Sequence, residues 1–514
     1  MSTLTYTQLE EIPKIHAAAQ AAFRSGRTKS VEYRKAQIAQ VAYMLKDNEQ
    51  RFKDALRSDL GRPYQETELM EFNPVYAEVK LAYDNVEKWT KPQSAPFGMN
   101  WFVMKPRLVA EPKGVVLIVS PFNVPIFLLL TPLISAIAGG NGAVLKPSEQ
   151  TPVFSALVAE LVPKYLDPEL YHVINGGIPE TTKILELPWD HIVYIGNARV
   201  GRIIATAAAQ HLTPVTLELG GKNPVVVDPR FDVGLAARRI LWGRFSNAGQ
   251  ICLAPEYVLV PAHFQDAFVD ALKEAYASFY PDGPAQSDSF SRIVTSAHAE
   301  RIKKMIDGTH GTVVVGGEAD IENRYVAPTI VRDVKEGDSL LSDEIFGPVL
   351  ALVPVKDVDA AIEFIRARDH PLAVYVFTHD SEFEQKVFSN TSSGAAVTNE
   401  TVITAGVPGL PVGGVGPSGY GYYTSKQGFD ELIHWRVSIK NPGWVDKFVF
   451  YFRYPPYRKD YQKYTKASTA ALPPRPSKSL ANGTAKRWGF WLLFALVGVS
   501  SVVLTRLKRP LLRA

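Results

Sequence analysis

The sequence predicts an α/β protein built on parallel sheets, with a hydrophobic helix near its C-terminus. From residue 114 onwards, short apolar runs alternate with helical segments, which is typical of strands buried on both faces of a parallel sheet. The 514 residues exceed what one hydrophobic core organises, and 46% hydrophobic with 21% charged residues is a globular composition. Residues 488–505 carry no charge. We therefore expect a globular body of several domains, followed by a segment of membrane length.

The expected elements alternate in a regular order. A helix is predicted over Ser30 to Lys46, because Ile38, Val41 and Leu45 share one face. Further patterns predict strands over 114–119, 142–146, 171–174, 191–195 and 214–218, and helices over 126–138, from 153, and over 199–210. Open parallel sheets bind ligands beyond the carboxyl ends of their strands. This order of elements indicates a nucleotide site.

The C-terminal tail combines an uncharged stretch with basic flanks. Trp488 to Thr505 would span about 27 Å as a helix, close to the thickness of a bilayer core. Basic residues flank both ends, and Trp488 and Trp491 lie where an aromatic belt would be. Residues 451–514 hold 13 Lys and Arg against one acidic residue, whereas the rest of the chain is mildly acidic. A buried soluble helix is the alternative, but charges at both ends favour a membrane anchor.

This anchor is the only insertion signal that we find in the sequence. Residues 1–14 lack the basic, apolar and small-residue order of a signal peptide. We therefore expect a tail-anchored protein whose body stays in the cytosol. Under the positive-inside rule, the basic C-terminal flank argues against this orientation. We interpret the flank instead as a feature that bears on which membrane is chosen.

Three familiar site patterns are absent or out of context. Gly414 to Gly419 matches G-x-G-x-x-G but lies outside any strand–helix–strand unit, so we interpret it as a structural loop. The ten histidines show no metal-ligand spacing, and no metal is expected. The body has no basic nucleic-acid face, so no nucleic-acid partner is expected.

Cys252 is the only cysteine in the chain. A single thiol excludes an intrachain disulfide and a multi-cysteine metal site, which leaves an inert core residue or a nucleophile. Lone cysteines are usually small buried hydrophobes, which favours the inert interpretation, and the residues next to Cys252 do not change that expectation. The choice depends on residues elsewhere in the chain.

Polar motifs at the predicted strand ends decide this choice. In order they are Ser120-Pro-Phe-Asn123, Lys146-Pro-Ser-Glu149, Glu218-Leu-Gly-Gly-Lys-Asn-Pro224, the Cys252 region and Glu344-Ile-Phe-Gly-Pro348. Over roughly residues 8–457 the chain resembles the NAD(P)-dependent aldehyde dehydrogenases, most of all their class 3 branch. With its hydrophobic tail it is similar to membrane-anchored fatty aldehyde dehydrogenases of fungal type. The resemblance implies a Rossmann-like parallel-sheet cofactor domain.

The resemblance implies that Cys252, Glu218 and Asn123 are catalytic. Oxidising an aldehyde needs a nucleophile, because hydride leaves a tetrahedral adduct but not a planar carbonyl. Cys252 would add to the aldehyde, and Asn123 with the Cys252 backbone N–H would form the oxyanion hole. After hydride transfer, Glu218 would activate the water that hydrolyses the thioester. Taken singly, Glu218 could be a surface carboxylate and Asn123 a turn former.

The resemblance also implies NAD as the cofactor, with NADP possible. Lys146 and Glu149 would hold the adenine ribose, and Glu149 favours NAD because a carboxylate repels a 2′-phosphate. Taken alone, these two residues could also be a solvated pair. Glu344 and Phe346 would hold the nicotinamide ribose and ring. The pyrophosphate would meet backbone N–H groups of a glycine-rich turn, with the residues Gly196, Asn197 and Gly201.

The expected domains also follow from the resemblance. They are a cofactor domain over 1–90 and 113–218, a catalytic domain over 219–417, a bridging β element over 91–112 and 418–447, an interfacial segment and linker over 448–485, and an anchor over 486–509. Trp101–Met104 and His434–Ile439 are the candidate bridging strands. Because the family joins its subunits through this element, a homodimer is expected.

Long-chain aliphatic aldehydes are the favoured substrates, because they accumulate in lipid where the anchor would hold the enzyme. Aromatic or short-chain aldehydes remain open with the same chemistry, an acyl-CoA-forming reductase is a weaker alternative, and an inactive membrane-tethered scaffold is one from another class. The endoplasmic reticulum is the expected location, with the mitochondrial outer membrane, peroxisome and lipid droplet left open. Phe122 stands where the family has tryptophan and keeps an aromatic wall.

Overall fold

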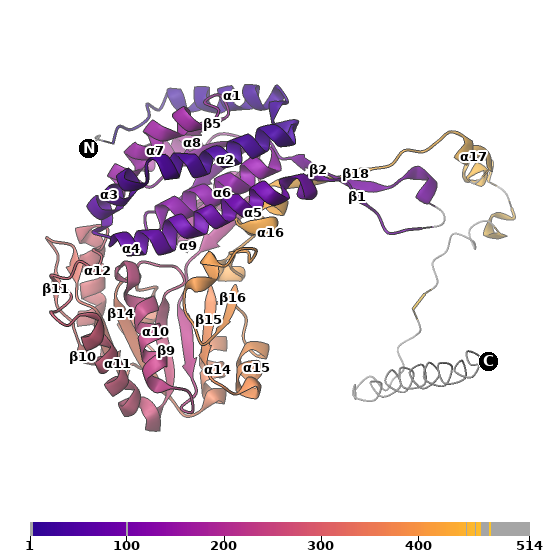
Figure 1. Cartoon of the computed structure of the whole chain (residues 1–514). Coiled ribbons are helices and arrows are strands. Elements are labelled where there is room, and N and C mark those ends of the chain that lie inside the picture. Colours follow the sequence, from indigo (N-terminus) through magenta and orange to yellow (C-terminus); the bar gives the residue numbers. More distant parts are fainter. Residues whose placement is uncertain (1–3, 99–100, 449, 458, 464–471, 474–514) are drawn as a thin grey trace, which may run out of the picture. The chain divides into compact units, whose positions relative to one another are not determined.

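The structure is a computed structural model, and it describes residues 4–98, 101–448, 450–457, 459–463 and 472–473. Contacts divide the chain into two compact units, one of residues 1–95 with 106–438 and one of residues 96–105 with 439–514 (Figure 1). The predicted boundary between cofactor and catalytic domains, at residue 218, falls inside the first unit and stays a prediction.

A six-stranded sheet in the first unit has the order β17–β7–β6–β3–β4–β5. Its strands are β3 (Val115–Val119), β4 (Gly142–Lys146), β5 (Tyr171–Val173), β6 (His191–Gly196), β7 (Val215–Leu219) and β17 (Gly419–Tyr420). All neighbours are parallel except β17, which runs antiparallel to β7 with Gly419 opposite Glu218. The five parallel strands match their predicted ranges closely, which confirms the predicted parallel-sheet fold.

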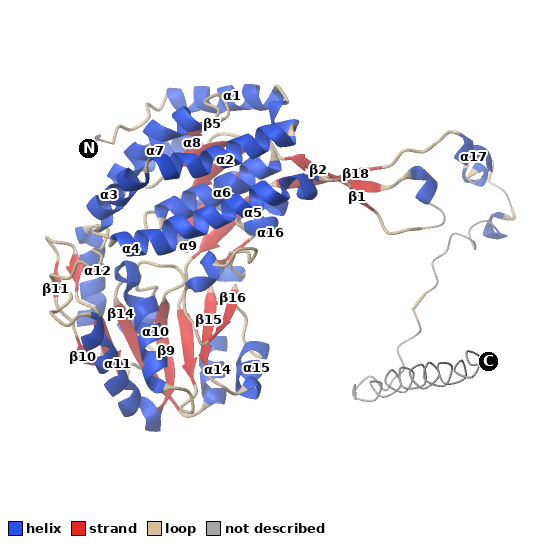
Figure 2. Cartoon of the chain, in the orientation of Figure 1, coloured by secondary structure: helices blue, strands red, loops and turns tan. Residues whose placement is uncertain are grey.

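Helices cover both faces of this sheet (Figure 2). They are α1 (Glu11–Arg24), α2 (Val31–Asp47), α3 (Glu49–Leu60), α4 (Tyr64–Thr67), α5 (Asn73–Thr90), α6 (Pro125–Gly139), α7 (Pro152–Tyr165), α8 (Ile178–Leu185), α9 (Ala198–Ala209) and α16 (Ser425–Glu431). On β3, Val116 and Ile118 belong to the core of α2, α5, α6 and α7, whereas Val115 and Leu117 belong to that of α1, α8 and α9. Burial on both faces explains the unbroken apolar strand sequences.

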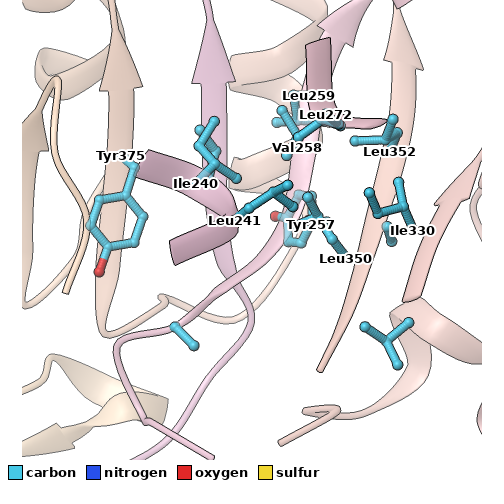
Figure 3. Close-up of a cluster of buried hydrophobic side chains, with 14 of the residues drawn as sticks. Ile240, Leu241, Tyr257, Val258, Leu259, Leu272, Ile330, Leu350, Leu352 and Tyr375 are labelled. Carbon is cyan, nitrogen blue, oxygen red and sulfur yellow. The ribbon is translucent and has the colours of Figure 1, made fainter. Parts of the chain in front are cut away.

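The later part of the first unit forms a seven-stranded sheet with the strand order β10–β13–β14–β9–β8–β15–β16. Its strands are β8 (Asn223–Val227), β9 (Pro255–Pro261), β10 (Thr312–Val315), β13 (Thr329–Arg332), β14 (Val349–Val355), β15 (Ala373–Phe377) and β16 (Ala395–Thr398). Its helices are α10 (Val233–Phe245), α11 (Gln265–Phe279), α12 (Ser296–Asp307), α13 (Ser339–Ser342), α14 (Val358–Arg366) and α15 (Ser381–Ser389), and a short hairpin joins β11 (Ala319–Asp320) and β12 (Tyr325–Val326). Ile240 and Leu241 of α10 lie in one core with Val258 of β9 and Leu350 of β14 (Figure 3).

A three-stranded antiparallel sheet contains one of the two predicted bridging strands. It consists of β1 (Gln93–Ser94), β2 (Arg107–Pro112) and β18 (Ile433–Ser438). The last of these overlaps the predicted strand over 434–439.

The other bridging prediction, a strand over Trp101–Met104, is wrong. Phe102–Met104 forms a 3₁₀ turn in the second unit. The N–H groups of Trp101 and Phe102 donate to the Gly98 carbonyl, and the Met104 N–H donates to the Trp101 carbonyl and closes the 3₁₀ turn. Met104 packs in an apolar cluster with Phe450. A short helix in the same unit, α17 (Trp444–Phe448), follows β18 along the chain.

The predicted anchor over 486–509, including the uncharged stretch 488–505, lies outside the described residues. Within the described part of the chain, no helix has both the length and the apolar character needed to cross a membrane.

Candidate active site

Glu218, the predicted base, is the penultimate residue of β7 and is 1% exposed. Among the residues that the structure describes, neither of its carboxylate oxygens has a hydrogen-bond partner. Burial raises the pKa of Glu218 well above its usual value, and the nearby backbone N–H of Gly414 opposes this rise only in part. Burying an unpartnered carboxyl costs stability, so such a group is typical of a functional site.

Cys252, the predicted nucleophile, is partly buried in a tight loop between α10 and β9. Asn247 in this loop has a φ of 51°, a left-handed conformation that is costly for most residues. Gly249 has a φ of 76°, and a Cβ there would lie 2.2 Å from the Gly347 carbonyl oxygen, so only glycine fits. The Cys252 carbonyl accepts a 2.7 Å hydrogen bond from Asn223 Nδ2. The loop therefore fixes the backbone that carries the thiol.

The thiol lies near two carboxyl groups, the buried Glu218 and the half-buried Glu344. Burial raises the pKa of Cys252, and the negative charges of Glu218 and Glu344 raise it further. Glu344 also lies against Gly220, two residues after Glu218, so these three side chains belong to one site. The structure thus brings together residues that lie 34 and 92 positions apart in the sequence.

Asn123, the predicted oxyanion residue, lies in the turn between β3 and α6 and is 2% exposed. Its backbone carbonyl accepts a 2.8 Å hydrogen bond from Asn247 Nδ2 and a second one from Arg62. Asn247 precedes Cys252 in the same loop. These bonds join the Asn123 turn to the loop of the thiol.

Glu344 and Phe346 lie between α13 and β14. They contact the turns that follow β7 and β3. Burial raises the pKa of Glu344 to about 8, and the charge of Glu256 adds to the rise. A Cβ on Gly220 would lie 2.1 Å from a Glu344 carboxylate oxygen, so this carboxyl rests on the turn after β7. The Phe346 and Phe122 rings meet edge to face, with centroids 5.8 Å apart. An aromatic wall therefore links the turns after β3 and before β14.

The predicted adenine-side residues lie at and after the ends of β4 and β6. Lys146 Nζ and Glu149 Oε2 are 2.8 Å apart, with the lysine buried and the glutamate one-third exposed. Asn197 caps α9, because its Oδ1 accepts the Val200 N–H at 3.0 Å. These residues stand at the sheet edge where a dinucleotide is expected.

Two glycines keep the same turn narrow. A Cβ on Gly196 would lie 2.3 Å from the Tyr194 hydroxyl, and one on Gly201 would lie 3.0 Å from the Leu219 side chain. The start of α9 can approach a pyrophosphate closely, and the Glu149 carboxylate can accept hydrogen bonds from ribose hydroxyls. Both features fit a dinucleotide cofactor. No cluster of three or more His, Cys, Asp or Glu in the described part of the chain could hold a metal ion.

The glycine-rich stretch Gly414–Gly419 is a loop, as predicted, but it lies against Glu218. It contains a 3₁₀ turn and leads into β17, which pairs with β7. A Cβ on Gly419 would lie 2.1 Å from the Leu217 carbonyl oxygen, so its glycines serve close packing of backbones. Their spacing was visible in the sequence, but the strand they pack against was not.

Arg62 and Asn247 also touch the site, and sequence reasoning missed both. Arg62 is fully buried, although arginine is rarely buried. No periodic pattern marks a single arginine in a loop as buried, so the sequence offered no signal for it. For Asn247, the signal available was its position five residues before Cys252, just ahead of Gly249-Gln250.

Known proteins resemble this chain over most of its length. The model of the aldehyde dehydrogenase family matches residues 1–437. Aldehyde dehydrogenase family 3 member B1 of Mus musculus is 42% identical over 437 residues, which cover 85% of this chain and 92% of the relative. The dimeric NADP-preferring aldehyde dehydrogenase of Canis lupus familiaris is 39% identical over 87% of this chain and 98% of its own.

A solved structure shares the fold as well. The substrate-bound AldH of Staphylococcus aureus superposes with a TM-score of 0.85 at 36% identity, covering 89% of this chain and 99% of that one. Family match, sequence identity and fold agree over most of the length. The chain therefore belongs to the aldehyde dehydrogenase family, and it is an NAD(P)-dependent oxidoreductase.

Proposed function

We propose that the chain oxidises long-chain fatty aldehydes to fatty acids, with Cys252 as nucleophile, Glu218 as base and Asn123 as oxyanion donor. The observation that carries this proposal is the buried, unpartnered carboxyl of Glu218 beside the only thiol of the chain. An inert core cysteine would need no such neighbour. The same arrangement argues against a scaffold without activity.

In the first step, the Cys252 sulfur adds to the aldehyde carbon and the carbonyl oxygen becomes negative. The side chain of Asn123 and the Cys252 backbone N–H would donate to that oxygen, and losing one such donor typically costs ~10²–10³ in rate. Because burial and two carboxylates raise the pKa of Cys252, the thiol must lose its proton to a base as it attacks. The raised pKa of Glu218 suits that carboxylate to accept the proton.

In the second step, the oxidised substrate leaves Cys252 as an acid. Glu218 first releases the proton of the thiol to solvent. It then takes a proton from water while the water oxygen attacks the thioester carbon; the carbon–sulfur bond breaks and the leaving sulfur takes up that proton, which releases a carboxylic acid and the thiol. When bound, NAD(P) supplies the acceptor for the hydride. Lys146, Glu149 and the turn of Gly196, Asn197 and Gly201 would hold its adenosine and pyrophosphate end.

Glu344 and Phe346 would hold the nicotinamide end of the same cofactor. The position of Glu344 over Gly220, next to the strand of Glu218, supports this role. The Phe346 ring packed on Phe122 supports an aromatic wall at the reacting end.

Replacing Glu149 with Gln should shift cofactor choice toward NADP. The neutral amide no longer repels a 2′-phosphate, and Lys146, 2.8 Å away, loses its partner and can pair with that phosphate. We expect the NADP-to-NAD ratio of kcat/KM to rise about tenfold, which equals ~1.4 kcal/mol. Glu322→Gln, in the exposed turn of the β11–β12 hairpin, is the matched control and should leave the ratio unchanged. An unchanged ratio in Glu149→Gln would remove this residue from the cofactor site.

Location and assembly are further parts of the proposal. The uncharged stretch 488–505 with basic flanks supports an anchor in the endoplasmic reticulum membrane, with the body in the cytosol. The sheet of β1, β2 and β18, which exposes Val437, supports a bridging role in a homodimer. Sedimentation velocity in detergent at micromolar concentration tests the dimer, and a monomer mass there would contradict it.

Substrate class is tested with the purified full-length chain in lipid vesicles. NADH formation is measured with aldehydes from C2 to C18 and with benzaldehyde. The value of kcat/KM should rise at least about tenfold from C4 to C12, because each buried CH₂ contributes ~0.8 kcal/mol. A flat profile would contradict the fatty substrate. In a parallel arm, a chain ending at residue 485 should stay in the supernatant when membranes are sedimented, and sedimentation of that chain would contradict the anchor.

A further inference from the structure

One guanidinium group contacts three parts of the proposed site. Arg62, between α3 and α4, donates from Nε and Nη2 to Asn247 Oδ1 at 3.1 and 2.6 Å, and Nη2 also donates to the Asn123 carbonyl. Nη1 donates to Glu71, whose other carboxylate oxygen accepts the Phe127 N–H at 2.9 Å. Arg62 and Glu71 are both 0% exposed. Arg62 thus holds the Asn123 turn directly and, through Glu71, the start of α6 that follows the turn.

The same contacts hold the loop that carries Cys252. Asn247 Nδ2 donates to the Asn123 carbonyl at 2.8 Å and to the Gln250 carbonyl at 3.0 Å, and the Asn247 N–H donates to Glu66 at 3.0 Å. Asn247 and Ala248 both have left-handed backbones, which persist only where the surroundings hold them. Arg62, by bonding to Asn247 Oδ1, fixes the amide that makes these bonds.

Stability alone does not account for this buried pair. Placing Arg62 and Glu71 out of water removes hydration from two charges, and an apolar pair of similar volume is often at least as stable. What a guanidinium adds is direction, because its N–H donors form a rigid planar fork. Arg62 and Asn247 both donate to the Asn123 carbonyl. These two donors restrain the peptide plane of that carbonyl, and with it the direction of the Asn123 side chain.

We propose that Arg62 is a positioning residue for the oxyanion hole. It holds the Asn123 amide and the Cys252 loop in a fixed relation, so that both donors meet the oxygen of the adduct. This inference rests on the proposed roles of Asn123 and Cys252. It assigns to Arg62 no contact with substrate or cofactor.

The test is a double-mutant cycle between Arg62→Lys and Asn123→Ala, which isolates the coupling between two positions. Lysine keeps a positive charge beside Glu71 but loses the planar fork. The measurement is the rate of the first turnover of NADH formation at saturating aldehyde and NAD. In the otherwise unaltered chain, Arg62→Lys should lower this rate about tenfold with KM within twofold, since small misplacements at a reacting centre cost that much or more. In the Asn123→Ala chain it should lower the rate less than twofold.

Arg34→Lys is the matched control. Arg34 is also buried and donates to the backbone carbonyls of Thr28 and Ala138, away from the Asn123 turn. It should lower the melting temperature without changing the rate per folded molecule. Equal factors for Arg62→Lys in both backgrounds, or an equal loss in Arg34→Lys, would overturn the positioning role. If Asn123→Ala itself keeps the full rate, the proposed function of Asn123 has failed instead.

If Arg62→Lys does not fold, Asn247→Asp provides the second cycle. Aspartate keeps an oxygen for Arg62 and tolerates the left-handed backbone, but it cannot donate to the Asn123 carbonyl. Coupling to Asn123→Ala is again expected, and multiplicative losses would again overturn the proposal.

Discussion

Cys252→Ser should abolish aldehyde-dependent NADH formation, with kcat at least about 10⁴-fold below that of the unaltered chain. The hydroxyl of serine is a far weaker nucleophile than a thiolate, and the surrounding carboxylates oppose its ionisation further. Because the substitution changes one atom, binding of NAD and the melting temperature should stay as they were. Stopped-flow absorbance at 340 nm measures the first turnover as well as the steady state. Activity equal to that of the unaltered chain would end the proposed mechanism.

The single thiol provides an independent readout of the same residue. Any thiol reagent that reacts with the chain reacts at Cys252, because no other cysteine exists. Labelling at one equivalent should remove activity, and aldehyde or NAD should protect against it. Full activity after complete labelling would contradict the nucleophile as directly as an active serine variant.

Glu218→Gln should stop the reaction after one turnover. Without the base, the thioester on Cys252 hydrolyses slowly, and we expect the steady-state rate to fall by ~10²–10⁴, the usual contribution of a general base. The first NADH should still form, more slowly where Glu218 also takes the thiol proton. Intact-protein mass spectrometry should then find the acyl group on the enzyme. An undiminished steady state would contradict this role.

The same residue sets the pH dependence. Burial raises the pKa of Glu218 well above its usual value, and only the ionised form can accept a proton. The fraction in this form increases with pH, so the rate should rise from acid to alkaline pH through the raised pKa, and Glu218→Gln should lose this rise. Burial also raises the pKa of Glu78 to about 7, but its carboxylate accepts the Ser425 N–H. Glu78→Gln is therefore the matched control and should keep the rise.

The sequence predicted an element correctly where one local feature, such as a run of buried residues, decides its structure. Nearly all residues of β3, β4, β6 and β7 are buried, so their sequences predicted the limits of these strands within a residue or two. The polar residues that follow these strands lie at one edge of the sheet, because the carboxyl ends of parallel strands all lie at that edge. The helix predicted to begin at Ser30 does begin there, because the Ser30 hydroxyl accepts the Tyr33 N–H and caps α2.

Sequence reasoning failed where tertiary partners decide. Trp101–Met104 has a strand-like composition, yet the turn at Gly98 and the packing of Met104 on Phe450 override it. Arg62 meets Asn247 across 185 residues, and no local pattern encodes such a pairing. The glycines of 414–419 were read as a loop in isolation, while their spacing reflects the edge of β7.

The antiparallel pairing of β17 with β7 has a consequence for the order in which the nascent chain can become active. Glu218 and its opposite residue, Gly419, are separated by about 200 residues, which include the whole seven-stranded sheet. While those residues emerge from the ribosome, β7 is an open edge strand that ends beside a carboxyl still reachable by water. Enclosure of the base waits until translation has nearly finished, shortly before the tail itself is made. A polypeptide released after residue 252 but before residue 419 would carry Cys252 and Glu218 but not β17, the strand that pairs with β7 opposite Glu218.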